Sequence, residues 1–396
     1  MRPPFLPASL RSQSAYRHLT RVCLLSVFAA SPVRAQVAVS ANDGKAALVD
    51  GVTSVARTPS PDTVTVLDLS VWPPRIAGEL RAPTSVVGPP QSVAIAPDRS
   101  IAIVTAALKL DPADAAKTTP DETVTVVDLR ASPPAALATL RAGRQPSGVS
   151  INPAGTLALI ANRAEGTVSV FTIAGKTVTP AGTVDLGARD SGPSHVVFTP
   201  DGARALVTRN NDSLVSVLAV RGTAVTNAKQ DFVAGLKPYG IDVTPDGRAA
   251  IVANIGAGTT GGADTLSVVD LTAAPPRAVD QVSIGLVPEG IAISPDGRFV
   301  AVTVMNGSGA AKTASFYRDH GLLKILRLDG LALRPVTEIE VGQWCQGVAW
   351  HPDGRSLLVQ CMIERAIRTL RFDGTQLTPG PPIAVGGGPA GLRARD

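Results

Sequence analysis

The chain has 396 residues and a formal net charge of +5, from 37 lysines and arginines against 32 aspartates and glutamates. Five of the arginines and no lysine or acidic residue lie in residues 1–35, so the remaining chain carries 32 residues of each sign. The positive charge is therefore a property of the first 35 residues, and the rest offers no electrostatic attraction for nucleic acid.

Residues 1–35 have the pattern of a signal peptide for export. Basic residues precede an apolar run over Val22–Ala30, and Val33-Arg34-Ala35 precedes a plausible cleavage point. The run is too short to cross a bilayer about 30 Å thick. The alternative is an apolar helix kept on the mature protein. We expect cleavage after residue 35, a periplasmic or secreted protein, and no membrane span after cleavage.

Residues 36–396 contain a turn that recurs at intervals of 45 to 57 residues. Each copy is a Pro-Asp-Gly-like triplet followed by an apolar strand. A period near 50 with several short strands indicates a propeller, because one such unit cannot bury both of its faces alone. The seven copies begin at Asn42, Pro97, Pro153, Pro200, Pro245, Pro295 and Pro352.

Each repeat also contains strands that alternate at period two, such as Thr63-Val-Thr-Val66 and Thr123-Val-Thr-Val126. We predict an all-β fold, a seven-bladed β-propeller of four-stranded antiparallel blades, as a single domain over residues 36–396. Pro389-Ala-Gly391 repeats the start of an innermost strand, so the C-terminal segment is expected to complete the first blade. Alternatively, Val37–Ser40 forms that strand and the C-terminal segment is an extension.

Two longer patterns support a family resemblance. Pro146-Ser-Gly148 leads to Asn162, and Pro238-Tyr-Gly240 leads to Asn254, each with an opening Pro-x-Gly, a strand, a turn and a strand ending in Asn. These patterns resemble the YVTN-repeat propellers, a group that includes lactonase-like propellers, across nearly all of residues 36–396. The resemblance implies the fold and leaves the chemistry open, because such folds have many activities.

In such a blade, the residue after the opening proline lies at one mouth of the central channel. A polar ring there is a candidate ligand site, and the alternative is a channel lined with water. The long connections 50–61, 106–121, 255–263 and 305–320 are expected on the same face. The ring positions are Gln91, Ser147, Ser194, Tyr239, Glu289, Gln346 and Ala390.

His195 replaces the glycine of the opening Pro-x-Gly and is the candidate general acid or base, although a hydrogen-bonded channel residue is the simpler interpretation. In a hydrolase, His195 and Glu289 would activate water and Arg209 would stabilise the oxyanion. His351 precedes a turn on the far face and is interpreted as a surface residue. His320 lies in a charged and aromatic loop, 316–320, that is a candidate partner contact.

Lactonase-like propellers of the gluconolactonase type hold a divalent cation, and this resemblance suggests calcium on Glu289, Asn162 and Asn254. Both asparagines, however, occupy the repeat position at which Asn makes local hydrogen bonds. The matching positions in other units do not form a ligand set, so we predict no metal and no other cofactor, with calcium as the alternative. The residues at the Asn position of the other units are Gly51, Ala106, Arg209, Val304 and Cys361.

Cys345 occupies the opening-proline position of the last unit and Cys361 its Asn position. These positions face each other across a hairpin, within reach of a disulfide, and an exported protein meets an oxidising compartment. We therefore predict a disulfide between Cys345 and Cys361. The alternative is a pair of buried thiols.

The leading functional hypothesis is an exported, monomeric binding module whose long-loop face recognises a small ligand or a periplasmic protein. The alternative is a lactonase-like hydrolase with its active site at the channel mouth. A third class is a docking partner in electron transfer, whose redox centre would belong to the partner because no Cys-x-x-Cys-His motif occurs. Whether the protein is an enzyme is left open by the sequence.

Overall fold

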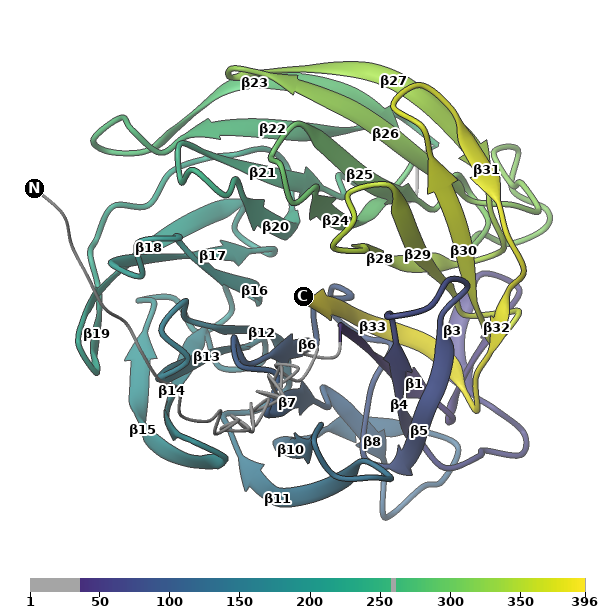
Figure 1. The fold of residues 1–396 in the computed structure, drawn as a ribbon, viewed down its shortest axis with the longest axis horizontal. Coiled ribbons are helices and arrows are strands. Elements are labelled where there is room, and N and C mark those ends of the chain that lie inside the picture. Colours follow the sequence, from purple (N-terminus) through teal and green to yellow (C-terminus); the bar gives the residue numbers. More distant parts are fainter. Residues whose placement is uncertain (1–35, 258–260, 396) are drawn as a thin grey trace, which may run out of the picture. The chain divides into compact units, whose positions relative to one another are not determined.

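The computed structural model describes residues 36–257 and 261–395, which lie in the compact unit Ala35–Asp396. The predicted signal peptide lies outside the described residues. Seven antiparallel sheets are arranged in a ring about a central axis (Figure 1), and the predicted all-β, seven-bladed propeller is confirmed. Within the described residues, no helix is long and apolar enough to cross a membrane.

Each blade runs outward from an innermost strand beside the axis. Blade 1 consists of β33 (Gly388–Arg395), β1 (Val37–Asp43), β4 (Thr63–Asp68) and β5 (Arg75–Arg81). Blade 2 consists of β6 (Val93–Ile95), β7 (Ile101–Thr105), β10 (Thr123–Asp128) and β11 (Ala135–Arg141). Blade 3 consists of β12 (Pro146–Ile151), β13 (Leu157–Asn162), β14 (Thr167–Ala174) and β15 (Thr177–Asp185).

The next blades follow the same order along the chain. Blade 4 consists of β16 (Pro193–Phe198), β17 (Arg204–Arg209), β18 (Leu214–Arg221) and β19 (Ala224–Asn227). Blade 5 consists of β20 (Pro238–Val243), β21 (Ala249–Asn254), β22 (Asp264–Asp270) and β23 (Arg277–Gly285). Blade 6 consists of β24 (Pro288–Ile293), β25 (Phe299–Val304), β26 (Leu322–Asp329) and β27 (Ala332–Glu340).

Blade 7 has a divided outer edge, because two short strands pair with the same third strand. It consists of β28 (Cys345–Trp350), β29 (Ser356–Cys361), β30 (Ala366–Phe372), β31 (Leu377–Pro379) and β32 (Ile383–Ala384). Two hairpins lie between the second and third strands of blades 1 and 2, within connections whose sequence shows no strand pattern. They are β2 (Ala46–Val49) with β3 (Val52–Val55), and β8 (Leu108–Leu110) with β9 (Thr118–Pro120).

Burial explains the composition of the strands. Every residue of the second strands β1, β13, β21 and β29 is buried, because both faces of these strands pack against neighbouring blades. The outer strands β5 and β11 are largely exposed. The apolar side chains form seven clusters, one between each pair of adjacent blades, and an eighth cluster at one end of the axis.

The recurring turn joins the first and second strands of a blade. In blade 4, Asp201 Oδ1 accepts a hydrogen bond from the backbone of Ala203 at 3.0 Å, and Gly202 has φ of +68°. Glycine suits this left-handed conformation because it has no Cβ. Blade 2 places Arg99 at the same position with φ of +57°. We call this side of the ring the turn end and the opposite side the loop end.

The two termini close the ring together, as predicted. β33 is the innermost strand of blade 1 and pairs with β1 along its whole length (Figure 1). One consequence corrects the sequence interpretation: Asn42-Asp43-Gly44 is not the turn between the first two strands. Asn42 instead lies near the end of the second strand, opposite Pro389, so Asn42, and not Gly51, holds the Asn position of blade 1.

Candidate functional site at the loop end

Three asparagines at the ends of second strands make the same local contacts. Asn42 Nδ2 donates to the hydroxyls of Thr63 and Thr65 at 3.0 and 2.9 Å. Asn162 does so with Thr167 and Ser169, and Asn254 with Thr265 and Ser267. These amides are thus used within their own blades, and they do not join Glu289 as metal ligands.

Arg209 occupies this Asn position in blade 4 and has the same structural role. Its Nη1 lies 3.2 Å from the Ser216 hydroxyl and 2.7 Å from Asp231 Oδ2, and its Nη2 binds Asp212. Two carboxylates therefore neutralise this guanidinium within blade 4. The predicted role of Arg209 as an oxyanion donor beside Glu289 is wrong, because its side chain is held by its own blade.

The arginine that does reach the ring is Arg163, which the sequence interpretation missed. It follows Asn162 at the end of β13, and its Nη1 donates to the Ser194 hydroxyl at 2.5 Å. Its guanidinium carbon lies 5.6 Å from the ring centroid of Tyr239, a cation–π arrangement. Arg163 of blade 3 thus spans blade 4 to reach blade 5. One feature of the sequence could have indicated this role: Arg163 comes one residue after a repeat asparagine, Asn162.

Tyr239 is buried and crosses toward the segment that precedes β6. Its hydroxyl has a hydrogen bond with the backbone of Gly88, while Thr208 of blade 4 donates to its carbonyl at 2.7 Å. Burial raises the pKa of the Tyr239 hydroxyl, and the nearby Glu289 raises it further. Tyr239 therefore stays protonated and provides a fixed hydrogen-bond donor next to that carboxyl group.

Glu289 begins the innermost strand of blade 6 and is only 7% exposed. Burial raises the pKa of its carboxyl group to about 7, against the opposing effects of a hydrogen bond with Gln346 and the charge of Arg163. Gln346 Nε2 donates to Glu289 Oε2 at 3.4 Å. A carboxyl group with this pKa exists in both protonation states near neutral pH, as a general base requires.

The other predicted ring residues surround this pair. Gln91 of blade 2 lies near Gly240 of blade 5, with its Nε2 3.1 Å from the point that a Cβ of Gly240 would occupy. Buried polar atoms normally have partners, so those without a protein partner are available to water or a ligand. Around the ring they are Gln91 Oε1, Ser92 Oγ, Ser147 Oγ, His195 Nδ1 and Gln346 Oε1.

His195 is also buried, and its backbone N–H donates to the Thr208 hydroxyl at 3.0 Å. Burial, with a smaller effect from the positive charge of Arg393, lowers the pKa of its imidazole to about 3. The ring is therefore neutral at physiological pH and cannot act as a cationic acid. No described hydrogen bond joins His195 to Glu289, and their joint activation of water stays a prediction.

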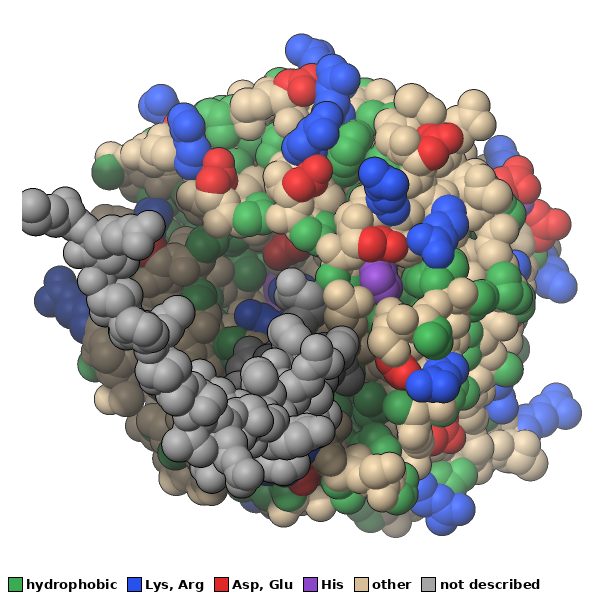
Figure 2. Space-filling model, in the orientation of Figure 1, with side chains coloured by type: hydrophobic (Ala, Val, Ile, Leu, Met, Phe, Trp, Pro, Cys, Tyr) green, Lys and Arg blue, Asp and Glu red, His purple; other side chains and the backbone are tan. Residues whose placement is uncertain are grey.

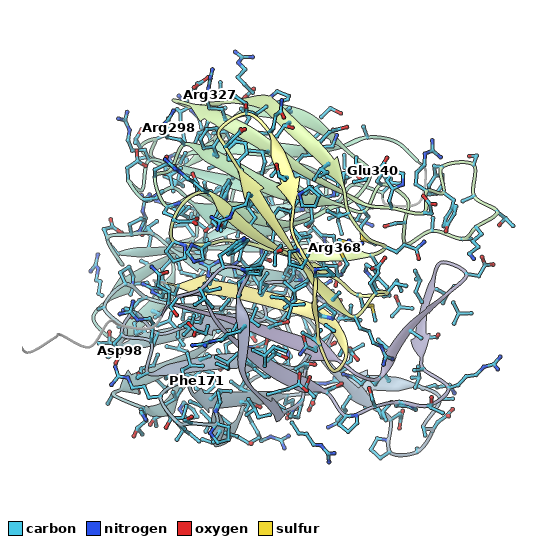
Figure 3. The ribbon with its side chains drawn as sticks, turned by 45° about the vertical axis from the view of Figure 1, so that its right-hand side comes forward. Asp98, Phe171, Arg298, Arg327, Glu340 and Arg368 are labelled. Carbon is cyan, nitrogen blue, oxygen red and sulfur yellow. A yellow bond between two sulfur atoms is a disulfide. The ribbon has the colours of Figure 1, made fainter. Side chains whose placement is uncertain are left out.

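An arch covers the loop end. It is formed by the β2–β3 hairpin, which projects from the blades (Figure 3), and by residues 305–320. Asp50 at the hairpin tip accepts a hydrogen bond from the backbone of Lys312 at 3.1 Å. Beneath the arch, Val86, Met305, Trp344, Met362 and Ala390 form the eighth apolar cluster. Ala390 is the ring residue of blade 1, so this cluster adjoins the polar ring.

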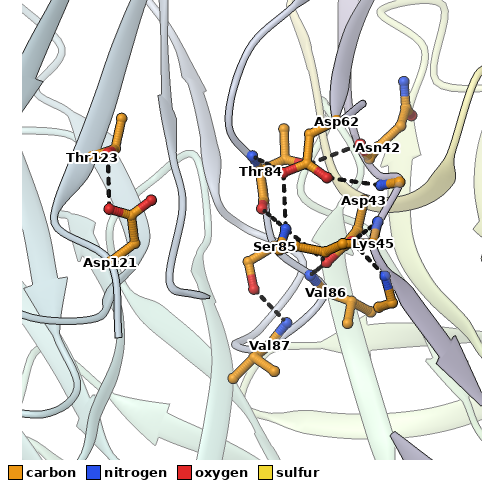
Figure 4. A network of polar contacts seen from close by, with 12 residues as sticks. Asn42, Asp43, Lys45, Asp62, Thr84, Ser85, Val86, Val87, Asp121 and Thr123 are labelled. Carbon is orange, nitrogen blue, oxygen red and sulfur yellow. Dashed lines mark hydrogen bonds and ion pairs between the residues drawn. The ribbon is translucent and has the colours of Figure 1, made fainter. Parts of the chain in front are cut away.

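The base of the hairpin is fixed by a buried ion cluster (Figure 4). Lys45 Nζ lies 2.8 Å from Asp62 Oδ2 and 3.3 Å from Asp43 Oδ2. Asp43 also accepts the backbone N–H of Val86 at 2.8 Å. Burial raises the pKa of Asp62, although Lys45 opposes this effect. Every charge in the cluster has a partner, so we assign it a structural role in positioning the arch.

Cys345 and Cys361 form a disulfide in the structure and are fully buried. They face each other at the start of β28 and the end of β29, at the same register as Pro146 and Asn162 in blade 3. The disulfide lies next to Gln346, and so it anchors one side of the polar ring.

The two remaining histidines lie away from the ring. His351 is not a surface residue as predicted: it is buried, its Nε2 lies 2.9 Å from the Leu69 carbonyl, and its ring contacts Trp72 edge-on. It therefore joins blade 7 to blade 1. His320 lies between Asp319 and Glu340, at 2.9 and 3.3 Å. Nothing in the structure tests the partner role predicted for its loop.

The donor set does not suit a divalent cation. Among the described residues, no three His, Cys, Asp or Glu side chains are grouped closely enough to hold a metal ion. Among the described contacts, the polar neighbours of Glu289 are the Gln346 amide, the Tyr239 phenol and the Arg163 guanidinium. We therefore describe the site as an acid–base cluster with one carboxyl group and one guanidinium group.

Comparison with known proteins agrees with this architecture. The family described as "Lactonase, 7-bladed beta-propeller" matches residues 149–337, a segment that includes Arg163, Tyr239 and Glu289. Over this segment the chain resembles that family, and its described residues form a seven-bladed propeller. No protein in the comparison with curated sequences matches it.

Solved structures similar to this lactonase-like propeller cover nearly its whole length. An inferred 6-phosphogluconolactonase of Bacteroides uniformis has a TM-score of 0.70 at 14% identity, covering 91% of this chain and 100% of its own. The periplasmic gluconolactonase of Pseudomonas aeruginosa has a TM-score of 0.64 at 18% identity, covering 91% and 98%. A protein of unknown function from Desulfotomaculum acetoxidans has a TM-score of 0.68 at 14% identity, covering 90% and 98%. At these identities the likeness establishes the fold alone.

Proposed function

We propose that the protein hydrolyses a lactone at the loop end, with Glu289 as the general base. The observation that supports this most is the buried Glu289 carboxyl group, with its pKa near 7, beside the guanidinium of Arg163. The family match and the gluconolactonase among the similar structures favour this reaction over the binding module that the sequence alone favours.

In the proposed reaction, ionised Glu289 removes a proton from a water molecule as its oxygen adds to the lactone carbonyl. Arg163 stabilises the oxyanion that forms. Collapse of this intermediate breaks the ring C–O bond, and the departing alkoxide takes the proton back from Glu289. The product is a hydroxycarboxylate. Gln346 holds Glu289 in place through its hydrogen bond, and the arch limits access of bulk water.

We also propose that the protein acts in the periplasm. Three observations support this: the predicted signal peptide, the buried disulfide between Cys345 and Cys361, and the periplasmic gluconolactonase with the same fold. Disulfides persist in oxidising compartments. Fractionation of the cells that produce the protein, with detection by antibody, tests this location; a cytoplasmic signal would contradict it.

A lactone panel assayed with and without chelator tests the reaction. We expect hydrolysis that chelator leaves unchanged, and a rate that rises with pH through about 7 as Glu289 ionises. Glu289→Gln and Arg163→Gln should each lower kcat about 100-fold. Glu165→Gln, on the same connection as Arg163, is the matched control and should retain full activity.

Two results would overturn the proposal. One is hydrolysis that Glu289→Gln leaves intact. The other is a protein that binds lactones without turnover, which would return the binding module to first place. Circular dichroism and thermal melts of each variant separate loss of chemistry from loss of fold.

A further inference from the structure

A cavity lies at the turn end of the axis. It has a volume of about 470 Å³ and is bordered by the turn prolines Pro245, Pro295 and Pro352. Small-molecule sites have volumes of about 300–1,000 Å³. Its wall includes Trp350 and the charged residues Asp242, Arg393 and Arg395. None of these residues belongs to the site at the loop end.

Asp242 and Arg393 occupy the same position in two different blades. Each is the fourth residue after the opening proline, in β20 of blade 5 and β33 of blade 1. The matching residues of the other five blades are uncharged. The innermost strands thus present one acid and one base at this level of the axis. The uncharged residues are Ala94, Ser150, Val197, Ala292 and Ala349.

These two charges attract each other without forming an ion pair. Arg393 lowers the pKa of Asp242, against the larger, opposite effect of burial, yet no salt bridge joins them among the described residues. The Asp242 carboxylate is held by the backbone N–H groups of Val243 and Ile293 at 3.1 and 3.0 Å, which leaves lone pairs on both oxygens.

The backbone of Arg393 pairs with Val39 in the sheet of blade 1, but its side chain has no ion pair or hydrogen bond within the described part of the chain. The other titratable group that its charge affects is His195, which is neutral because burial and Arg393 both lower its pKa. A guanidinium beside a cavity, without a carboxylate partner, is suited to bind a carboxylate through two parallel hydrogen bonds.

We propose that this turn-end cavity binds a small carboxylate that also carries a hydroxyl group. Arg393 binds the carboxylate, and Asp242 accepts the hydrogen bond of the hydroxyl. The apolar wall that includes Trp350 and Ala292 packs against the carbon chain. The site is independent of the chemistry proposed at the loop end, and it uses none of the same side chains.

Calorimetric titration of the purified protein with 3-hydroxybutyrate, and with butyrate as the probe that lacks the hydroxyl, tests this site. We expect saturable binding of 3-hydroxybutyrate and at least several-fold weaker binding of butyrate. Arg393→Gln should weaken 3-hydroxybutyrate binding at least tenfold, and Asp242→Asn should remove the preference for the hydroxyl compound. Arg393→Lys, which keeps the charge, should weaken binding less than Arg393→Gln does.

Ser150→Ala, at the matching position of blade 3, is the control and should leave the affinity unchanged. Arg163→Gln should also leave it unchanged, which separates this cavity from the loop end. Absence of saturable binding to the folded parent protein would overturn the proposal. The proposal would also be overturned if Arg393→Gln left the affinity for 3-hydroxybutyrate unchanged while circular dichroism showed an intact fold.

Discussion

The two ends of the axis are built from the same innermost strands but present different electrostatics. At the loop end, Glu289 is buried under an arch, and Arg163 lies over the ring of Tyr239. At the turn end, Asp242 and Arg393 are half-buried beside a cavity, and neither side chain forms a salt bridge within the described residues. The comparison teaches that burial raises the pKa of a carboxyl group at both ends of the axis, and that side chains on other blades oppose this effect, Gln346 and Arg163 for Glu289 and Arg393 for Asp242.

The visible part of the face in Figure 2 shows no comparable separation of charge. Basic and acidic side chains alternate around the face seen in Figure 2, in keeping with the equal numbers of each outside residues 1–35. The polarity that distinguishes the two ends therefore lies near the axis, where a few side chains face one another across blades.

The largest expected effect is on the pH dependence of stability. It tests how far burial raises the pKa of the Glu289 carboxyl group. Its pKa is about 7 in the folded protein against an ordinary value of 4.5, so the folded state holds the proton more tightly. The parent protein should lose stability as pH rises from 4.5 to 7, by about 3 kcal/mol. Glu289→Gln cannot ionise, and it should be more stable than the parent by this amount at pH 8 and no more stable at pH 4.

Urea unfolding of both proteins at the two pH values measures the difference. Asp242→Asn is the comparison from the turn end: burial also raises the pKa of Asp242, but its partial exposure makes the gain at pH 8 smaller. Equal gains from the two variants would remove the contrast between the ends.

Removal of the disulfide should cause a smaller loss of stability. This disulfide anchors only the loop end of the ring. Replacing Cys345 and Cys361 together with alanine opens a loop of 16 residues in sequence separation. In the chain-entropy description this costs about 2–3 kcal/mol of unfolding free energy. Reduction of the parent protein under denaturing titration should give a similar loss, and an unchanged midpoint in both experiments would contradict the prediction.

The smallest expected effect is on the local stability of the arch. Asp50→Ala removes the hydrogen bond from Lys312 and should cost about 1 kcal/mol locally, with little change in global unfolding. Amide exchange over residues 46–55 should then accelerate about fivefold. Asp114→Ala, in the turn of the β8–β9 hairpin, is the control. Unchanged exchange would show that the hairpin is held by packing alone.

Much of the fold could be predicted because its signals are local. The Pro-Asp-Gly turn needs a glycine conformation within a few consecutive residues, and the Val-Thr-Val strands need only their own alternation. Blade 1 was harder, because its innermost strand lies at the other end of the chain. The sequence consequently predicts a turn at Asn42, although Asn42 hydrogen-bonds Thr63 and Thr65 as the other repeat asparagines do.

The candidate site was only partly predictable. The positions that follow the opening prolines identified Tyr239, Glu289 and Gln346 as members of one ring, and the structure brings these three together. The sequence also suggested Arg209 and did not suggest Arg163, because residue type alone does not show where a long side chain ends. Arg209 is neutralised by Asp212 and Asp231, whereas Arg163 extends across a blade.

By itself, the sequence determined the repeat, the strands and the two cysteines that face each other, since each depends on residues within one blade. Only the tertiary structure decided which arginine meets Glu289, that His195 is neutral, and that Asp242 and Arg393 share a cavity. Those properties arise from burial and from charges on different blades, and both come into existence only when the ring closes.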